Sequence, residues 1–531
     1  MPKDWLKNLS HKAAHIKMLQ PVYIASLGKL DDSLEFQTTP ADLLGGDAGR
    51  GRWIANGQID MNGHRVPLDC DHWFLNTNYQ DTPFFTKLHG FEFLTELKSL
   101  GGDVGRKTAR DITQGWLDHF QKYDAYVWSI DLTAARMVNW MMAYDFAYGT
   151  ASDDFLDVFH LSFFRQYHHL RNALINKSYD DDFEKFNILW ALIITQCHCE
   201  QFYDEVDFQS YIQLIKGAVD DVSLSDGGLV DRNPQTLLNF AKSCLQLKQS
   251  LQQKSMTPPL WLAKKIENTV RLVNLLTHTD KDFPQFQGAT LPNKTDFEKI
   301  TILSNLRYRR NDTQLGDYGY TAMRKGRTSI VVDHGNDGDH LSPMAFEMGY
   351  ATHRMIVSCG TYFMDDQWAK GLSGTAAHSC LMVDNTEPKQ GLLDIKPSLE
   401  NLNGASLFSG THQGYVSDYG VTHTRRLYLD TLGEDIRGED VLARNIDIKP
   451  IEYCTRFHLH PSVKVSLIEG GALLRLPNGV GWIFTFSHGE LGIEESIHCA
   501  NGMTLRKSEQ LIINDTMGGL SHTLKWAFKK Q

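Results

Sequence analysis

Cysteine is scarce in this sequence, and the cysteines present form no spacing pattern. Eight of them are scattered over 531 residues, whereas disulfide-stabilised secreted domains are short and dense in cysteine. We therefore expect reduced thiols and no disulfide framework. The Cys-His-Cys run at 197–199 is expected to lie in a helix core, because neighbouring helix positions diverge and cannot form a zinc clamp alone.

Long apolar runs and an excess of positive charge are also missing. The sequence has no run of 18 apolar residues, and residues 1–20 lack the apolar core of a secretory signal. Its formal net charge is −11, whereas nucleic-acid-binding proteins concentrate positive charge. These absences favour a cytoplasmic protein with neither a nucleic-acid nor a membrane partner, although a local basic cleft stays possible.

The chain is longer than a single hydrophobic core usually grows, so two domains are expected. Before residue 300, apolar residues recur at three- and four-residue spacing, in the ranges 91–100, 109–123, 133–148, 155–176, 183–203, 211–219, 235–254 and 259–276. After residue 300, short apolar or alternating runs separated by turn residues predict strands, at 318–322, 329–332, 354–357, 379–383, 425–429, 451–459, 463–467, 473–476 and 482–485. We predict a helical domain over 1–305, curling into an arc or toroid, and an antiparallel β-sandwich over 306–531.

Residues 340–388 are the stretch around which the strand-rich half is organised. His340 and His378 border apolar β-forming runs at 355–357 and 380–383, which predicts that both histidines lie at strand ends of one sheet. Rigid strands that end in neighbouring loops often carry functional residues.

Several motifs, in this order and spacing, give the chain a resemblance to the heparinase II/III-like family of polysaccharide lyases. The helical-half motifs are Leu-His-Gly-Phe at 88–91, Arg136-x2-Asn139-Trp140 and Asp226-Gly227-Gly228-x2-Asp231-Arg232-Asn233-Pro234. The strand-half motifs are His340-x5-Phe346-Glu347-Met348, Val-Ser-Cys-Gly-Thr-Tyr at 357–362, Thr-Ala-Ala-His-Ser at 375–379, Val383-Asp384, Gly438-Glu439-Asp440 and Phe-His-Leu-His-Pro at 457–461.

The resemblance implies an incomplete α/α toroid followed by an antiparallel β-sandwich. It also implies β-elimination on a uronate-containing acidic polysaccharide or oligosaccharide in the cleft between the two domains. That chemistry needs a neutralised carboxylate, a base and an acid, and the candidates are His340, Arg232 and His334. The alternative is a non-catalytic glycan-binding or assembly protein that keeps the fold.

A structural zinc is the cofactor that the resemblance implies. His340 and His378 match two zinc ligands of zinc-binding members, but the third, acidic position is Ser358 here. The neighbouring Cys359 could supply a thiolate, which zinc accepts. The alternative is that both histidines are hydrogen-bonded core residues.

Two further positions depart from the family pattern. Gly338 stands where a second histidine is usual, and Thr236 stands where a tyrosine is usual. His334 is close enough in sequence to replace that histidine, or else it is a histidine at the surface end of a strand. Arg232 fits a carboxylate clamp through its planar fork, and equally fits an ion pair at the helix start.

Substrate contacts are expected at two other places. Arg136, Asn139 and Trp140 share one helix face, where they could line a sugar cleft or instead form a hydrogen-bond node beside a core tryptophan. Asn233 and Tyr362 lie in the resembling motifs and are expected to contact the glycan as well.

Overall fold

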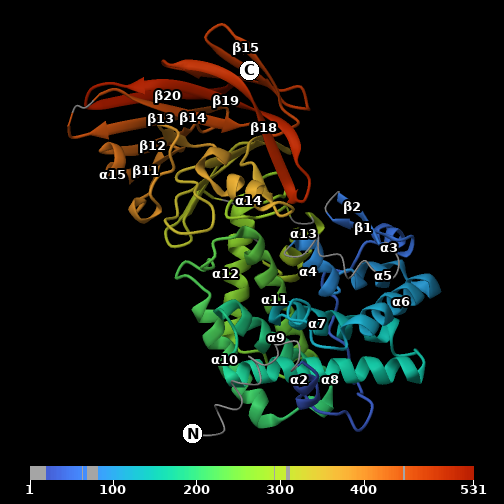
Figure 1. Ribbon diagram of the computed structural model, residues 1–531. Coiled ribbons are helices and arrows are strands. Elements are labelled where there is room, and N and C mark those ends of the chain that lie inside the picture. The colour runs from blue at the N-terminus through green and yellow to red at the C-terminus, as the bar shows by residue number, and fades with distance from the viewer. Residues whose placement is uncertain (1–19, 62–63, 69–81, 292–293, 307–310, 447–448) are drawn as a thin grey trace. The chain divides into compact units, whose positions relative to one another are not determined.

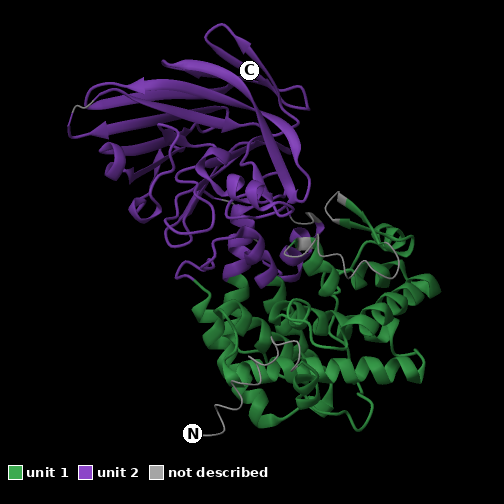
Figure 2. Cartoon of the chain, viewed as in Figure 1, with its two compact units in different colours: residues 1–223, 241–267 green, residues 224–240, 268–531 purple. Residues whose placement is uncertain are grey.

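The computed structural model describes residues 20–61, 64–68, 82–291, 294–306, 311–446 and 449–531. The chain forms two compact units, Met1–Ser223 with Ala241–Glu267, and Leu224–Phe240 with Asn268–Gln531 (Figure 2). The chain passes from one unit to the other after Ser223, Phe240 and Glu267. The domain boundary that the sequence places at residue 305 stays a prediction. Residues 1–20, for which the sequence predicts no secretory signal, lie outside the described residues except for Gln20.

The first unit is built from helices and one short hairpin (Figure 1). Its elements are α2 (Gln20–Ser26), α3 (Ala48–Ala55), β1 (Gln58–Met61), β2 (His64–Pro67), α4 (Pro83–His89), α5 (Leu94–Leu100), α6 (Gly102–Phe120), α7 (Ile130–Ala147), α8 (Asp153–Asn176), α9 (Asp182–His198), η4 (Glu200–Phe202) and α10 (Glu205–Asp221). α11 (Pro234–Gln253) and α12 (Leu260–Leu276) run through both units. None of the described helices is long and apolar enough to cross a membrane.

Side-chain caps explain where the longer helices begin. The side chain of Ser152 accepts a hydrogen bond from the Phe155 amide at the start of α8, and Asp181 does the same for the Glu184 amide at the start of α9. Carboxylates in a first turn also complement the helix dipole. α7 is buried along most of its length, as expected for a helix in the interior of a helical unit.

The second unit contains most of the strands. They are β3 (Thr313–Leu315), β4 (Tyr320–Lys325), β5 (Thr328–Asp333), β6 (Phe346–Tyr350), β7 (His353–Ile356), β8 (Gly360–Tyr362), β9 (Leu381–Val383), β10 (Ser398–Leu402), β11 (Ala405–Tyr415), β12 (Val421–Leu429), β13 (Asp435–Arg444), β14 (Ile451–His458), β15 (Lys464–Ile468), β16 (Gly471–Arg475), β17 (Gly481–Phe486), β18 (Glu490–Gly502), β19 (Arg506–Met517) and β20 (Ser521–Lys530). Short helices α13 (Lys294–Leu303), η5 (Thr375–Ala377), η6 (Gln390–Leu392), α14 (Asp366–Ser373) and α15 (Val416–Tyr419) complete the unit.

Three sheets share one hydrophobic core in this unit. Within the described residues their strand orders are β3-β4-β5-β6-β7, β8-β18-β19-β14-β9 and β10-β11-β12-β13-β20-β17-β16-β15. Phe346, Phe457 and Trp526, one from each sheet, contact one another in that core. Neighbouring strands are antiparallel except β18 and β8. The predicted fold class, a helical N-terminal region followed by antiparallel sheets, is confirmed.

Candidate functional site

His340 and His378 lie side by side, but next to strands of two different sheets, whereas the sequence predicts strand ends of one sheet. His340 is in the loop between β5 and β6, and His378 directly follows η5. Their rings meet edge to face with centroids 5.6 Å apart. Nδ1 of His340 and Nε2 of His378 have no hydrogen-bond partner among the described residues. The pair therefore presents two imidazole nitrogens whose lone pairs or protons are unused.

Burial keeps both imidazoles neutral near neutral pH. It lowers the pKa of His340 to about 4, with Asp339 and Asp333 opposing the shift, and it lowers the pKa of His378 well below the usual value. A neutral imidazole can accept a proton or coordinate a metal ion. The pair is thus unprotonated, and the same burial lowers the basicity of both imidazoles.

The backbone of His340 is held by Gln287. The Gln287 side chain accepts a hydrogen bond from the His340 amide at 3.0 Å and donates one to the His340 carbonyl at 3.1 Å. A Cβ on Gly338 would lie 2.2 Å from Oε1 of Gln287. The glutamine therefore fills the space that a side chain at residue 338 needs, which explains glycine where the family usually has histidine.

The Arg232 side chain is buried within the second unit, where its guanidinium is bound by other residues. It is 4% exposed, pairs with Asp333, and donates to the carbonyl oxygens of Tyr318 and Asp337. The structure thus supports neither a free carboxylate clamp nor a helix-start ion pair with Asp231 or Asp226. The ion pair that forms is with Asp333, a residue 101 positions away in the chain.

Asn233 starts a helix and also lies near His340. Its side-chain oxygen accepts from the Gln235 amide at 2.8 Å, so it caps α11. Its Nδ2 donates to the Gln287 carbonyl at 2.9 Å. A Cβ placed on Gly288 would lie 3.6 Å from Nε2 of His340 and 4.0 Å from Nδ2 of Asn233. The predicted substrate residue Asn233 therefore belongs to the same network as His340.

His334 occupies neither of the two places expected for it. It is 2% exposed, so it is not a surface histidine. Its Nε2 is 3.0 Å from the Thr321 hydroxyl, and its ring stacks on Phe408. Burial lowers its pKa to about 4. The structure corrects the catalytic expectation for His334, because its polar edge is turned to Thr321 inside the unit.

The expected zinc ligands do not come together as a set of three. Ser358 binds Nδ1 of His378 at 3.0 Å. The Cys359 thiol lies 3.4 Å from Nδ1 of His458 instead, and burial raises its pKa to about 12. The two histidines fit two ligand positions, but neither Ser358 nor Cys359 completes the set. We therefore derive no step through zinc at this place.

The Arg136 group belongs to the helical unit and is buried. Arg136 donates to Gln166 at 2.7 Å and to the carbonyls of His89 and Val127 at 3.0 Å. Asn139 binds the Gly90 carbonyl at 2.8 Å, and Trp140 is fully buried. The described contacts correspond to the hydrogen-bond node with a core tryptophan and not to a sugar-lining surface.

A pocket of about 670 Å³ lies in the strand-rich unit. Cys359, His458 and Ser496 line it together with Trp368, whose side chain is partly exposed. Tyr362 packs against Cys359 in the adjoining hydrophobic cluster, so this predicted substrate residue lies beside a real cavity. Sequence reasoning missed the pocket, because its lining residues come from two segments, 359–377 and 458–509, that are far apart in the chain. The motifs at 357–362, 375–379 and 457–461 contribute lining residues and were its visible signals.

Comparisons with known proteins give one family match and a consistent fold. Residues 307–527 match the sequence profile of the family described as heparinase II/III-like, C-terminal. FtsZ-localized protein C of Caulobacter vibrioides (strain NA1000 / CB15N) is 22% identical over 530 residues, covering 92% of this chain and 89% of that protein.

Two solved structures have the same fold over nearly the whole chain. Heparinase III is similar over 100% of this chain and 92% of its own, with a TM-score of 0.71 and 12% identity. A mutant of the heparan sulfate lyase HepC from Pedobacter heparinus is similar over 98% and 89%, with a TM-score of 0.63 and 14% identity. At these identities the likeness establishes the fold and leaves the chemistry to the residues of this chain.

Proposed function

Since residues 307–527 belong to the heparinase II/III-like family and the chain has the fold of heparinase III, we propose that this protein is a polysaccharide lyase-like protein that acts on an acidic glycan. The reaction class is β-elimination on a uronate-containing polysaccharide or oligosaccharide. The observation that carries the proposal is the neutral imidazole of His340, which meets the neutral imidazole of His378 edge to face.

His340 is the strongest of the three catalytic candidates. It keeps 8% of its surface exposed, against 4% for Arg232 and 2% for His334. In the proposed step, Nε2 of His340 accepts the proton from C5 of the uronate, because Nδ1 is buried. The C4–C5 double bond then forms as the bond from C4 to the leaving oxygen breaks, and that oxygen takes a proton from water. Asn233 and Gln287 hold the residues around this nitrogen in place.

Ultraviolet absorbance of the conjugated uronate product tests the proposal. Purified protein is mixed with a panel of uronate polymers, and product formation is followed for the wild type, His340→Ala and His353→Ala. Since Gln287 binds the backbone of residue 340, His340→Ala keeps both of those hydrogen bonds and should stay folded. We expect product with the wild type and His353→Ala, and a loss of about 100-fold or more with His340→Ala.

A second candidate is glycan binding or assembly without turnover. The specific observation that favours it is Arg232, whose guanidinium is bound to Asp333 and to main-chain oxygens, leaving no described clamp for a uronate carboxylate. The name of the relative, FtsZ-localized protein C, is consistent with an assembly role. A sugar ring could stack on Trp368 at the 670 Å³ pocket.

Binding measurements separate the two candidates. The binding candidate predicts saturable glycan binding that is unchanged in His340→Ala and weakened by Trp368→Ala, with no unsaturated product. An assembly role predicts that the tagged protein co-localises with FtsZ in cells. Unsaturated product that disappears in His340→Ala would contradict this second candidate.

A further inference from the structure

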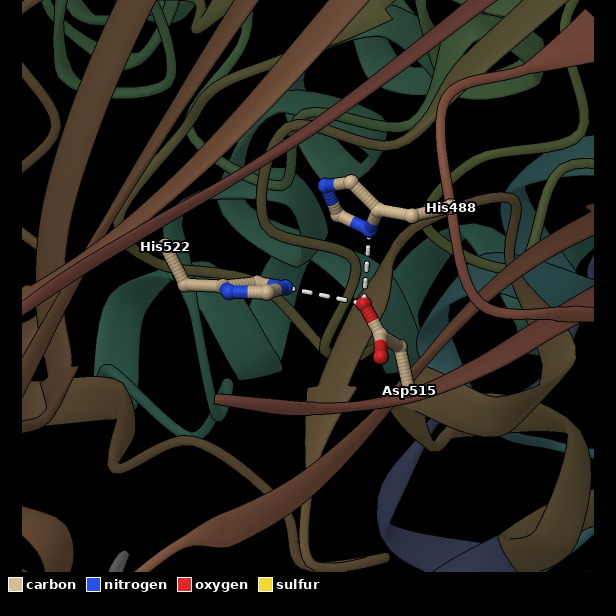
Figure 3. Close-up of side chains that lie close together, drawn as sticks. All are labelled: His488, Asp515 and His522. Carbon is tan, nitrogen blue, oxygen red and sulfur yellow. Dashed lines mark hydrogen bonds and ion pairs between the residues drawn. The ribbon is translucent and has the colours of Figure 1, made fainter. Parts of the chain in front are cut away.

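Three side chains of the strand-rich unit, His488, Asp515 and His522, converge outside the His340 region (Figure 3). Nδ1 of His488 and Nε2 of His522 each lie 2.8 Å from the same oxygen, Oδ2 of Asp515. The three are partly exposed, with 40%, 23% and 19% of the respective side chains accessible. Two imidazole nitrogens and a carboxylate oxygen within 4.8 Å of one another are a donor set used for divalent transition metals.

The fold brings the three residues together from two different sheets. His488 lies in the turn that leaves β17 for β18, Asp515 lies on β19, and His522 lies on β20. Gly489, with φ of +95°, allows the turn to pass close to β19, because a Cβ there would lie 2.9 Å from Ile513 and 3.0 Å from the Asn514 carbonyl. The position of His488 beside Asp515 therefore depends on a backbone approach that glycine permits.

Hydrogen bonds around the cluster orient the donor atoms. Nε2 of His488 is 2.7 Å from the Thr523 carbonyl, which can only accept, so that nitrogen carries the hydrogen. The Thr516 amide donates to Oδ1 of Asp515 at 2.8 Å, and the Tyr453 hydroxyl donates to Oδ2 at 2.8 Å. A metal-ligating histidine commonly donates its second ring N–H to a carbonyl in this way.

A cation can take the place of the hydrogens that join these side chains. Nδ1 of His488 lies 2.8 Å from Oδ2 of Asp515, while Nε2 of His488 is bound to the Thr523 carbonyl. A metal ion bound by both atoms would replace the hydrogen between them. Ligand bonds of about 2.0–2.2 Å in a tetrahedral site separate donor atoms by roughly 3.4 Å. Small rotations of the two exposed imidazoles would open that distance.

We propose that His488, Asp515 and His522 form a binding site for a divalent transition metal ion, with zinc as the first candidate. The site is independent of the proposed function at His340 and holds whether or not the protein cleaves glycans. Asp515 also lines a polar pocket of about 300 Å³ together with Tyr453, Glu452 and Glu490, whose carboxylates favour a cation.

Metal titration of the full chain tests this proposal. Metal-free protein at pH 7.5 is titrated calorimetrically with Zn²⁺, and with Co²⁺, whose visible absorption reports the coordination. The variants are His488→Gln, His522→Gln and the near-isosteric Asp515→Asn, and the matched control is His353→Gln, a partly exposed histidine on β7 of the same unit. Circular dichroism checks that each variant is folded.

We expect one submicromolar zinc site per chain in the wild type and the control, weakened at least 10-fold in each cluster variant. Zinc at 100 times its dissociation constant should also raise the melting temperature of the 531-residue chain by about 2–3 °C. Absence of submicromolar binding, or binding that the three variants leave unchanged, would overturn the proposal. Co²⁺ spectra that are unaltered by Asp515→Asn would overturn it as well, since adventitious metal elsewhere gives that result.

Discussion

The space beside Gly338 is occupied by the side chain of a residue that is distant in sequence, Gln287. Gln287 fills the space beside Gly338 and binds both backbone groups of His340. It also donates to Oδ2 of Asp333 at 3.0 Å, so it joins the His340 loop to the carboxylate that pairs with Arg232. Glycine at this position is thus part of how the loop is positioned.

Gly338→Ala should destabilise the protein by about 1–3 kcal/mol, since the new Cβ meets Gln287 and φ is +139°. The midpoint of urea unfolding measures this. Gly217→Ala is the control, because Gly217 lies in α10 with nothing within 4 Å and alanine there should be neutral or stabilising by about 0.5–1 kcal/mol. A double variant with Gln287→Ala should cost less than the sum of the single changes. Equal effects of the two glycine substitutions would contradict this account.

The sequence predicts the neighbours in this site better than it predicts their exposure. His340 and His378 are neighbours, although they lie next to strands of two different sheets and not on one sheet as the sequence predicts. The roles expected for Arg232 and His334 need access to a ligand, but both side chains are buried. Arg232 pairs with Asp333. His334 contacts Thr321 and Phe408. Periodicity and local motifs carry no information about such partners, so the burial of a polar side chain could not be predicted.

At the level of strands, the Gly438-Glu439-Asp440 motif, which carries part of the family resemblance, has a role in packing. A Cβ on Gly438 would lie 2.1 Å from the Trp526 indole. Glycine at this position of β13 therefore leaves room for the tryptophan of the paired strand β20. The indole N–H donates to Asp440 at 2.9 Å, and the same carboxylate accepts from buried Arg425 at 2.7 Å and binds His423. The strands predicted from the sequence include neither β13 nor β20, and their pairing could not be predicted because it joins residues 78 to 94 positions apart.

Asp440→Asn should cost about 3–5 kcal/mol, because it leaves the Arg425 guanidinium buried without its counter-charge. Thermal and urea unfolding of the purified variant measure the loss. The neighbouring Glu439→Gln is the matched control. Glu439 pairs with Arg426 at the surface, and exposed pairs contribute about 0–1 kcal/mol. Similar stability of the two variants would show that the network does not hold β12, β13 and β20 together.

The whole molecule contains many histidines that folding keeps neutral. Burial lowers the pKa of His334, His340 and His458 to about 4 each, whereas the unfolded chain has histidine pKa values near about 6.5. Between these values the unfolded state binds more protons than the folded state. The free energy of unfolding therefore falls as pH falls from about 6.5 to about 4, and the stabilisation is complete above that window.

We expect the melting temperature to decrease steadily from pH 7 to pH 4.5 and to be nearly constant from pH 7 to pH 8. Each fully shifted histidine contributes a slope of about 1.4 kcal/mol per pH unit. His334→Gln should reduce the slope by up to that amount, since glutamine can still bind Thr321 and does not titrate. Equal stability at pH 5 and pH 7.5, measured by differential scanning calorimetry, would contradict this account of the buried histidines.

The proposed elimination at His340 is tested most directly by mass spectrometry of the chain ends formed from a defined uronate oligosaccharide. Elimination gives a fragment with an unsaturated end, one water lighter than the fragment from hydrolysis. We predict such fragments with the wild-type protein and with His353→Ala, and none with His340→Ala in a folded state. A wild-type protein that binds the oligosaccharide and returns it intact would contradict the lyase function and support the binding alternative.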